Sequence, residues 1–143
     1  MRFRGSTLGD LQIVVRARFR LSAGDRAASE REIAEIVRWR REHQPGGQNA
    51  GSVVVNPIPG QLAAGELVDD LGLRGFRIGT AHVSEKHANF IQADEGGRAD
   101  DVRAVIEHVR TRVWAEHGIT LRSEVRLIGF ADSPAPAPGI ELP

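Results

Sequence analysis

Residues 48–57 read QNAGSVVVNP, and this stretch decides the fold of the chain because it joins a turn to a strand. Gly51 permits a tight turn, the three valines that follow Ser52 are typical of a buried strand, and Pro57 ends the run. Ser52 opens this strand at a point where the backbone can approach a ligand closely. The residues alone leave two interpretations open: Ser52 belongs to a binding site, or it is a turn residue at the entrance of a packed strand.

The sequence that follows this stretch alternates between helical and strand patterns. Apolar residues at helical spacing predict a helix that includes residues 62–71 and stops at Gly72. Residues 77–84 and residues 88–93 read as two strands, joined by the short polar turn of residues 85–87.

A stronger helical pattern comes next. Asp100 and Asp101 place negative charge where it suits the start of a helix, and Gly118 ends the helix. Its apolar stripe consists of Val102, Val105, Ile106, Val109 and Val113. Residues 122–129 read as a final strand. The order strand, helix, two strands, helix, strand predicts an α+β domain over residues 47–130, with both helices packed on one small sheet.

Upstream of the opening stretch, residues 11–21 alternate apolar side chains with arginines, which predicts a strand with one face in water. We expect this strand to belong to a strand pair within residues 3–21. A helix is predicted over residues 28–43, with Ser29 and Glu32 spaced like a capping box.

The ends of the main domain follow from two breaks in the pattern. Pro45-Gly46-Gly47 interrupts the helix, so residues 1–46 are interpreted as the remnant of another domain. Residues 131–143 are rich in proline and alanine and are predicted to be a disordered tail.

The composition narrows the class of protein. The chain has 143 residues, 41% of them hydrophobic, which suffices for one compact domain with additional segments. Its 19 basic and 19 acidic residues cancel, so no overall field attracts nucleic acid or an anionic membrane. It has no cysteine and no apolar run long enough to cross a bilayer. We expect a cytoplasmic protein without nucleic-acid or membrane partners.

Few side chains offer chemistry. The histidines show no paired spacing suited to a metal, so no metal site is predicted. His87 lies in a tight polar turn beside a strand, where a side chain can reach a ligand, although a structural role is an equal alternative. Glu124 and Arg126 share one face of the last predicted strand, a pair that usually faces water.

Three blocks of the sequence resemble one enzyme family. They are residues 48–57 (QNAGSVVVNP), residues 65–91 (GELVDDLGLRGFRIGTAHVSEKHANFI) and residues 123–129 (SEVRLIG). In this order they resemble the C-terminal part of UDP-N-acetylenolpyruvoylglucosamine reductase, the flavoenzyme of peptidoglycan precursor synthesis. The similarity runs from about residue 3 to residue 130, and its first residues resemble the end of that family's second flavin-binding domain.

The resemblance implies a catalytic set. In that family a hydride from reduced flavin reaches the enolpyruvyl double bond, and the neighbouring carbon is then protonated. Ser52 matches the family's proton donor, a weak acid that serves only if the carbanion is basic and within hydrogen-bond reach. Arg4 and Glu124 match the arginine and the glutamate that polarise the substrate carboxylate and stabilise the enolate.

The resemblance also implies substrate-binding residues. Asn56 matches a substrate-binding asparagine, and Arg40 falls where the family has a basic residue near the anionic ligand. Lys86 and His87 lie in the loop that lines the substrate side. The chain has no tyrosine, so it resembles the subgroup without a tyrosine-bearing loop over the substrate, or a degenerate member.

The resemblance implies FAD and NADPH as cofactors of the complete enzyme. The family's flavin-binding portion has no counterpart in this sequence, so we expect the chain alone not to retain FAD. Its expected partners are a UDP-sugar substrate and a flavin domain, carried by a longer protein or by a second chain. Self-association through the strands of residues 3–21 is also expected, because unpaired strand edges associate. The alternatives are a UDP-sugar-binding module without redox chemistry and a degenerate fragment.

Overall fold

The computed structural model describes residue 7 and residues 12–130, and their fold is α+β, as predicted. The helices are α1 (Arg26–His43), α2 (Ala64–Asp70) and α3 (Ala99–His117). The strands are β1 (Asn49–Ser52), β2 (Arg77–Ile78), β3 (Ala81–Val83) and β4 (Phe90–Ala93). The chain divides into two compact units, residues 1–34 and residues 35–143, and the division falls inside α1. The domain boundary predicted at residue 46 stays a prediction.

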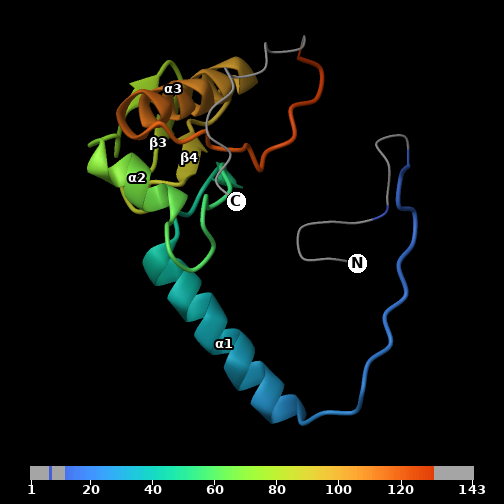
Figure 1. The fold of residues 1–143 in the computed structure, drawn as a ribbon. Coiled ribbons are helices and arrows are strands. Elements are labelled where there is room, and N and C mark those ends of the chain that lie inside the picture. The colour runs from blue at the N-terminus through green and yellow to red at the C-terminus, as the bar shows by residue number, and fades with distance from the viewer. Residues whose placement is uncertain (1–6, 8–11, 131–143) are drawn as a thin grey trace. The chain divides into compact units, whose positions relative to one another are not determined.

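The four strands form one antiparallel sheet in the order β1-β4-β3-β2. The register aligns Ser52 of β1 with Phe90 of β4, and Val83 of β3 with Ile91 of β4. Helix α3 contacts β2, β3 and β4, and α2 contacts α3 (Figure 1). The sheet and these two helices therefore enclose the core of the second unit.

Helix α3 supplies the largest share of this core. Four of the five residues of its predicted apolar stripe are buried, with exposed fractions of 2% or less: Val105, Ile106, Val109 and Val113. Val102 is partly buried and packs against them. Full burial of such a side chain stabilises a fold by about 1.5–3 kcal/mol. The helix ends where predicted, at Gly118, whose left-handed backbone lets its N–H donate to the carbonyl of Trp114.

Helix α1 begins at Arg26, two residues before the predicted start. Its first turn is capped by Asp25, whose carboxylate accepts from the N–H of Ala28 at 2.8 Å. The predicted capping box is therefore wrong: Ser29 lies inside the helix, and its hydroxyl donates to the carbonyl of Asp25. The helix buries none of its side chains within the described residues.

The predicted N-terminal strand is also wrong where the structure describes it. Residues 12–25 form no helix or strand, and Val15 and Phe19 are 93% and 77% exposed. An alternating strand is stable only when other strands pair with its edges and another layer covers its apolar face, and residues 12–25 pair with no strand in the part of the chain that the structure describes. Most of residues 3–11 lies outside the described residues, as does the predicted tail of residues 131–143.

Two further strand predictions need correction. Residues 77–84 are not one strand but the hairpin of β2 and β3, because Gly79 has φ +53° and supports a two-residue turn with Thr80. Residues 122–129 are not a strand but contain one bridge residue, Ser123, which pairs with Val54. The hydroxyl of Ser123 donates to the nearby carbonyl of Val125, a local bond that competes with strand pairing.

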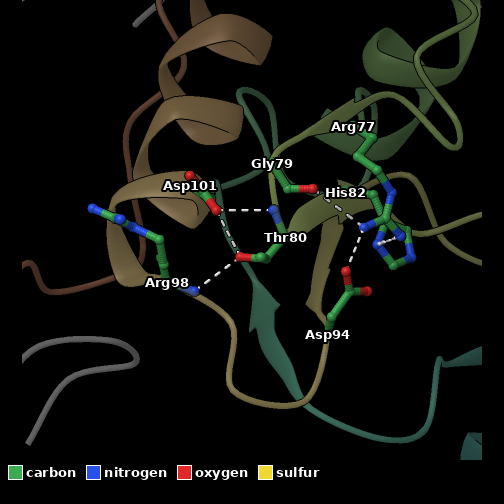
Figure 2. A network of polar contacts seen from close by, with 7 residues as sticks. All are labelled: Arg77, Gly79, Thr80, His82, Asp94, Arg98 and Asp101. Atoms are coloured by element: carbon green, nitrogen blue, oxygen red, sulfur yellow. Dashed lines mark hydrogen bonds and ion pairs between the residues drawn. The ribbon is translucent and has the colours of Figure 1, made fainter.

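The hairpin turn is fixed to the first turn of α3. The carboxylate of Asp101 accepts from both the N–H and the hydroxyl of Thr80, at 2.8 and 2.7 Å, and the N–H of Arg98 donates to the same hydroxyl (Figure 2). The Thr80 hydroxyl, the Thr80 N–H and the charge of Arg98 hold the pKa of Asp101 below its usual value, although desolvation opposes them. Asp101 therefore joins the sheet to the helix that covers it.

A second cluster lies on the other side of this turn. The guanidinium of Arg77 donates to the carboxylate of Asp94 at 2.7 Å and contacts the imidazole of His82 (Figure 2). Both members of the ion pair are about half exposed, so its contribution to stability is small. The cluster is a surface feature of the sheet.

Replacing Gly79 with alanine should destabilise the fold more than replacing Gly72. Both glycines have positive φ, so each Gly→Ala change costs about 1–2 kcal/mol of backbone strain. At Gly79 the new Cβ would also lie 2.5 Å from the Asp101 carboxylate, whereas at Gly72 no atom lies within 4 Å. Urea unfolding of the two variants measures the difference. Equal losses would mean that the Thr80–Asp101 contact adjusts without cost.

The Thr80–Asp101 contact also predicts how the fold responds to acid. Because the folded pKa of Asp101 is lowered, its contribution to stability is fully present above its ordinary pKa of 3.8 and is lost as the pH falls through the folded value. Asp101→Asn should therefore lose less stability than the parent chain between pH 6 and pH 3, measured by urea unfolding. Asp100→Asn, in the same helical turn, is the matched control. A parent-like acid response of Asp101→Asn would contradict the prediction.

Candidate functional site

Ser52 is the last residue of β1 and is partly buried. The strand carries a bulge between Asn49 and Ser52, and Gly51 within it has φ +70°. The side chain of Asn49 accepts from the N–H of Gly51 at 2.9 Å and holds the bulge in place. The predicted turn before Ser52 is therefore present, and it lies within β1 instead of preceding the strand.

The backbone of the valines after Ser52 is held by one residue, Asn89. The amide of Asn89 accepts from the N–H of Val54 at 3.1 Å and donates to the carbonyl of Val54 at 2.8 Å. The backbone carbonyl of Asn89 accepts from the N–H of Val53 at 3.0 Å. Residues 53 and 54 are therefore paired on one side by a single asparagine instead of a strand, which is why the predicted strand 52–55 is not regular.

The other side of this segment meets residues 122–124. The N–H of Val55 donates to the carbonyl of Arg122, and the N–H of Glu124 donates to the carbonyl of Val53, each at 2.9 Å. Glu124 thereby lies one hydrogen bond away from the residue that follows Ser52. The structure brings these two predicted catalytic residues together through the backbone of Val53. The side chain of Glu124 is exposed.

Asn56 is exposed and stands at the end of the same stretch. Its side-chain oxygen accepts from the N–H of Ala64, the first residue of α2, at 3.1 Å. The carboxylate of Glu66 accepts from the N–H of Ala63, so the two side chains together cap the helix. Asn56 therefore has a structural contact that the sequence did not predict.

Lys86 and Arg40 are exposed and make local contacts. The ammonium of Lys86 donates to the carbonyl of Arg41 in the last turn of α1, where a positive charge is favourable. The guanidinium of Arg40 donates to the side chain of Gln44 at 2.9 Å. Lys86 is thus adjacent to the residue that follows Arg40, and both lie at the end of α1.

His87 is partly buried. Burial, followed by the charge of Arg74, holds the pKa of His87 below its usual value. Its Nδ1 accepts from the N–H of Asn89 at 3.2 Å, which fits a ring protonated on Nε2. A Cβ on Gly65 would lie 3.5 Å from the ring, so α2 packs directly against His87. The Nδ1 contact supports the structural alternative for this residue.

Two residues of the site have roles that the sequence analysis does not assign. Asn89 is 5% exposed and organises residues 53 and 54; the signal is an amide near the start of residues 88–93, a run that is otherwise apolar except for Gln92. Arg74 bonds the carboxylate of Asp69 and the carbonyl of Glu85, each at 2.8 Å, and so fixes the loop that carries Lys86.

Three further predictions concern Arg4, a metal site and a membrane-spanning helix. Arg4 lies outside the described residues. Among the residues that the structure describes, no group of three His, Cys, Asp or Glu side chains is arranged to hold a metal ion. The same residues include no helix whose length and apolar character would let it cross a membrane.

Residues 42–128 match the family described as "UDP-N-acetylenolpyruvoylglucosamine reductase, C-terminal domain". A reductase of this name from Heliobacterium modesticaldum is 50% identical over 130 residues, which are 90% of this chain and 41% of the relative. Another from Chloroflexus aurantiacus is 43% identical over 116 residues, which are 81% of this chain and 38% of the relative. The chain therefore spans about two-fifths of the length of these curated relatives.

A solved structure agrees with these sequence matches. The crystal structure of the reductase from Thermus caldophilus superposes with a TM-score of 0.61 and 34% sequence identity, covering 76% of this chain and 38% of that one. Since the family match covers more than half of the chain and includes Ser52, Asn56 and Glu124, the chain belongs to the UDP-N-acetylenolpyruvoylglucosamine reductase family, whose C-terminal domain it carries.

Proposed function

We propose that this chain forms the substrate part of a UDP-N-acetylenolpyruvoylglucosamine reductase. The reaction is the reduction of the enolpyruvyl group of a UDP-sugar, with NADPH as electron source and FAD as carrier, to form UDP-N-acetylmuramate for peptidoglycan synthesis. The observation that carries the proposal is the family match over residues 42–128, within which residues 52 and 124 are held together through Val53. The cytoplasm, where UDP-sugar precursors are made, is the proposed location.

Ser52 is proposed to donate the proton. After a hydride has been added to one carbon of the double bond, the neighbouring carbon is enolate-like and takes a proton, so the substrate gains two hydrogens in total. A serine hydroxyl is a weak acid, and it transfers a proton efficiently only to a strong base held at hydrogen-bond distance. The fixed backbone of residues 52–55 supports this role, because it limits where the hydroxyl can lie.

Glu124 and Arg4 are proposed to act on the substrate carboxylate. A guanidinium binds a carboxylate through two parallel hydrogen bonds, and positive charge stabilises the enolate that develops next to it. Asn56, Arg40, Lys86 and His87 are proposed to bind the rest of the anionic substrate. Lys86 and His87 also make contacts within the chain: Lys86 with the carbonyl of Arg41, and His87 with the N–H of Asn89 and the ring of Phe90.

The described residues do not fit the pyrophosphate of FAD. Dinucleotide phosphates are commonly bound by the N–H groups at a helix N-terminus. Each helix of this structure places a carboxylate there instead: Asp25 at α1, Glu66 at α2, and Asp100 with Asp101 at α3. These carboxylates repel phosphate, so we propose that residues other than those described bind the flavin, in a longer protein or in a partner chain.

Ser52→Ala should separate the two halves of the reaction. In the reductase completed by its flavin-bearing part, oxidation of the reduced enzyme by the enolpyruvyl substrate is expected to slow by about 10²–10⁴-fold, the usual contribution of general acid catalysis. Reduction by NADPH should keep its rate, because it needs no proton from the substrate site. Substrate affinity should change little, since one hydroxyl contributes only about 0.5–1.5 kcal/mol. Stopped-flow absorbance of the flavin resolves both halves.

Two further variants complete this experiment. Glu124→Gln should slow the same half, because a carboxyl group can share a proton with the substrate carboxylate as the enolate develops, whereas an amide of the same size cannot give up a proton. Ser29→Ala, an exposed serine in α1, is the control and should leave both halves unchanged. Equal losses in both halves for Ser52→Ala, or no loss in the second, would mean that Ser52 is only a turn residue.

Asn56 calls for a pair of variants because it also caps α2. Asn56→Ala removes the oxygen that accepts from Ala64 and should lower stability by about 1 kcal/mol. Asn56→Asp keeps an oxygen acceptor at a helix N-terminus and should keep the stability. Both variants should raise the substrate KM if the amide binds substrate. A KM that rises only for Asn56→Ala would show that Asn56 acts through the cap alone.

A further inference from the structure

Asn89 occupies an unusual place in the fold. Its side-chain amide is buried and makes both of its hydrogen bonds in this contact to one residue, Val54, which is itself 1% exposed. A peptide group in a neighbouring strand would offer the same donor and acceptor. The amide of Asn89 therefore takes the place of a strand beside the segment that follows Ser52.

The backbone of Asn89 is fixed as well. Its carbonyl accepts from the N–H of Val53, and its N–H donates to Nδ1 of His87. A Cβ on Gly65 would lie 3.6 Å from the Cβ of Asn89, so α2 covers the residue. Because its backbone and side chain are both held, Asn89 has little conformational freedom. Its hydrogen bonds therefore also restrict the backbone of residues 53 and 54.

The segment that Asn89 holds connects Ser52 to Glu124. Ser52 immediately precedes Val53, whose N–H is bonded to Asn89 and whose carbonyl is bonded to the N–H of Glu124. On its other side Ser52 follows Gly51, around which no atom lies within 4 Å of a Cβ position. The contacts that constrain Ser52 are its pairing with Phe90, the hydrogen bonds of Asn89 to the residues that follow it, and the Asn49 contact that holds Gly51.

The chemistry of the contact requires an amide. A carboxylate of the same size still accepts from the N–H of Val54 but cannot donate, and its charge repels the carbonyl of Val54. An unpaired carbonyl in a buried site is destabilising, so the segment moves to satisfy it. A shift of about 1 Å in a catalytic group can reduce a rate by about 10²-fold.

We infer that Asn89 is a positioning residue for proton transfer: its amide clamps the backbone of Val54 and so sets the position of the Ser52 hydroxyl relative to Glu124. This inference rests on the proposed function, because it assumes that Ser52 is the proton donor. Asn89 itself does not touch the substrate and acts through the backbone.

The test uses Asn89→Asp in the reductase completed by its flavin-bearing part. Oxidation by the enolpyruvyl substrate should slow by about 10²-fold while reduction by NADPH is unchanged. The rate should recover as the pH is lowered, because a buried aspartic acid takes up a proton readily and can then donate to Val54. Combined with Ser52→Ala, Asn89→Asp should cause no further loss, since it acts only through that hydroxyl.

Controls separate positioning from simple loss of stability. Val109→Ala removes buried atoms from α3 and none of the hydrogen bonds of Val54, and should lower stability while both half-reactions keep their rates. If Asn89→Asp does not fold, Asn89→Ser, which is too short to make both bonds, takes its place. In this variant amide hydrogen exchange of Val54 should accelerate more than in Val109→Ala.

The outcomes are distinct. An Asn89→Asp loss that persists in the Ser52→Ala background, or no loss at all, overturns the positioning role while leaving Ser52 as proton donor. If Ser52→Ala alone loses nothing, the proposed function fails and this inference fails with it. Loss confined to the second half-reaction, absent in the double variant and reversed at low pH, supports the inference.

Discussion

Buried peptide groups need hydrogen-bond partners. In the segment of residues 53–55 a side-chain amide supplies part of this pairing, where a neighbouring strand would usually do so. Val53 and Val54 are 2% and 1% exposed, so unpaired N–H or carbonyl groups there would be costly. The partners are the amide of Asn89 on one side and residues 122–124 on the other. This arrangement ties the edge of the sheet to the segment after α3 and passes directly beside Ser52.

At the opposite edge of the sheet, the turn between β2 and β3 also has a backbone N–H group that needs a hydrogen-bond partner. A tight hairpin turn leaves the N–H of Thr80 without a partner in the strands, and the carboxylate of Asp101 accepts from it. The same carboxylate suits the N-terminus of α3, so one side chain stabilises both the turn and the helix. This contact fixes the position of α3 relative to β2 and β3, so that the buried valines of α3 pack against the sheet.

The sequence predicts those parts of the fold whose signals are local. Helices α2 and α3, their glycine ends and the apolar stripe of α3 follow from spacing within a single segment. The β2–β3 turn was not predicted because Gly79 reads as the interior of a strand until its φ is known. The segment of residues 122–129 does not form the predicted strand because its pairing is limited to one bridge, between Ser123 and Val54, which lie far apart in the sequence, and because the Ser123 hydroxyl bonds locally to Val125. In the site, the residues alone left the role of Ser52 open, and Asn56 and Glu124 were predicted as site residues from the family resemblance; these roles stay predictions. The Asn89 contact to Val54 and the Arg74 contact to Glu85 arise only in three dimensions.

The charged groups at the helix N-termini differ from the groups of the candidate site. Carboxylates occupy the start of each helix that the structure describes, where a phosphate would otherwise bind, whereas the candidate site offers a hydroxyl, an amide and one carboxylate on a rigid segment. In the proposed function the hydroxyl would supply a proton and the amide would orient the substrate, whereas dinucleotide binding is assigned to residues other than those described. If Ser52 is the proton donor, as proposed, its weak acidity makes its contribution depend on how closely it is held to the carbon that takes the proton. The hydrogen bonds of the Asn89 amide to Val54 limit the position of the segment that follows Ser52.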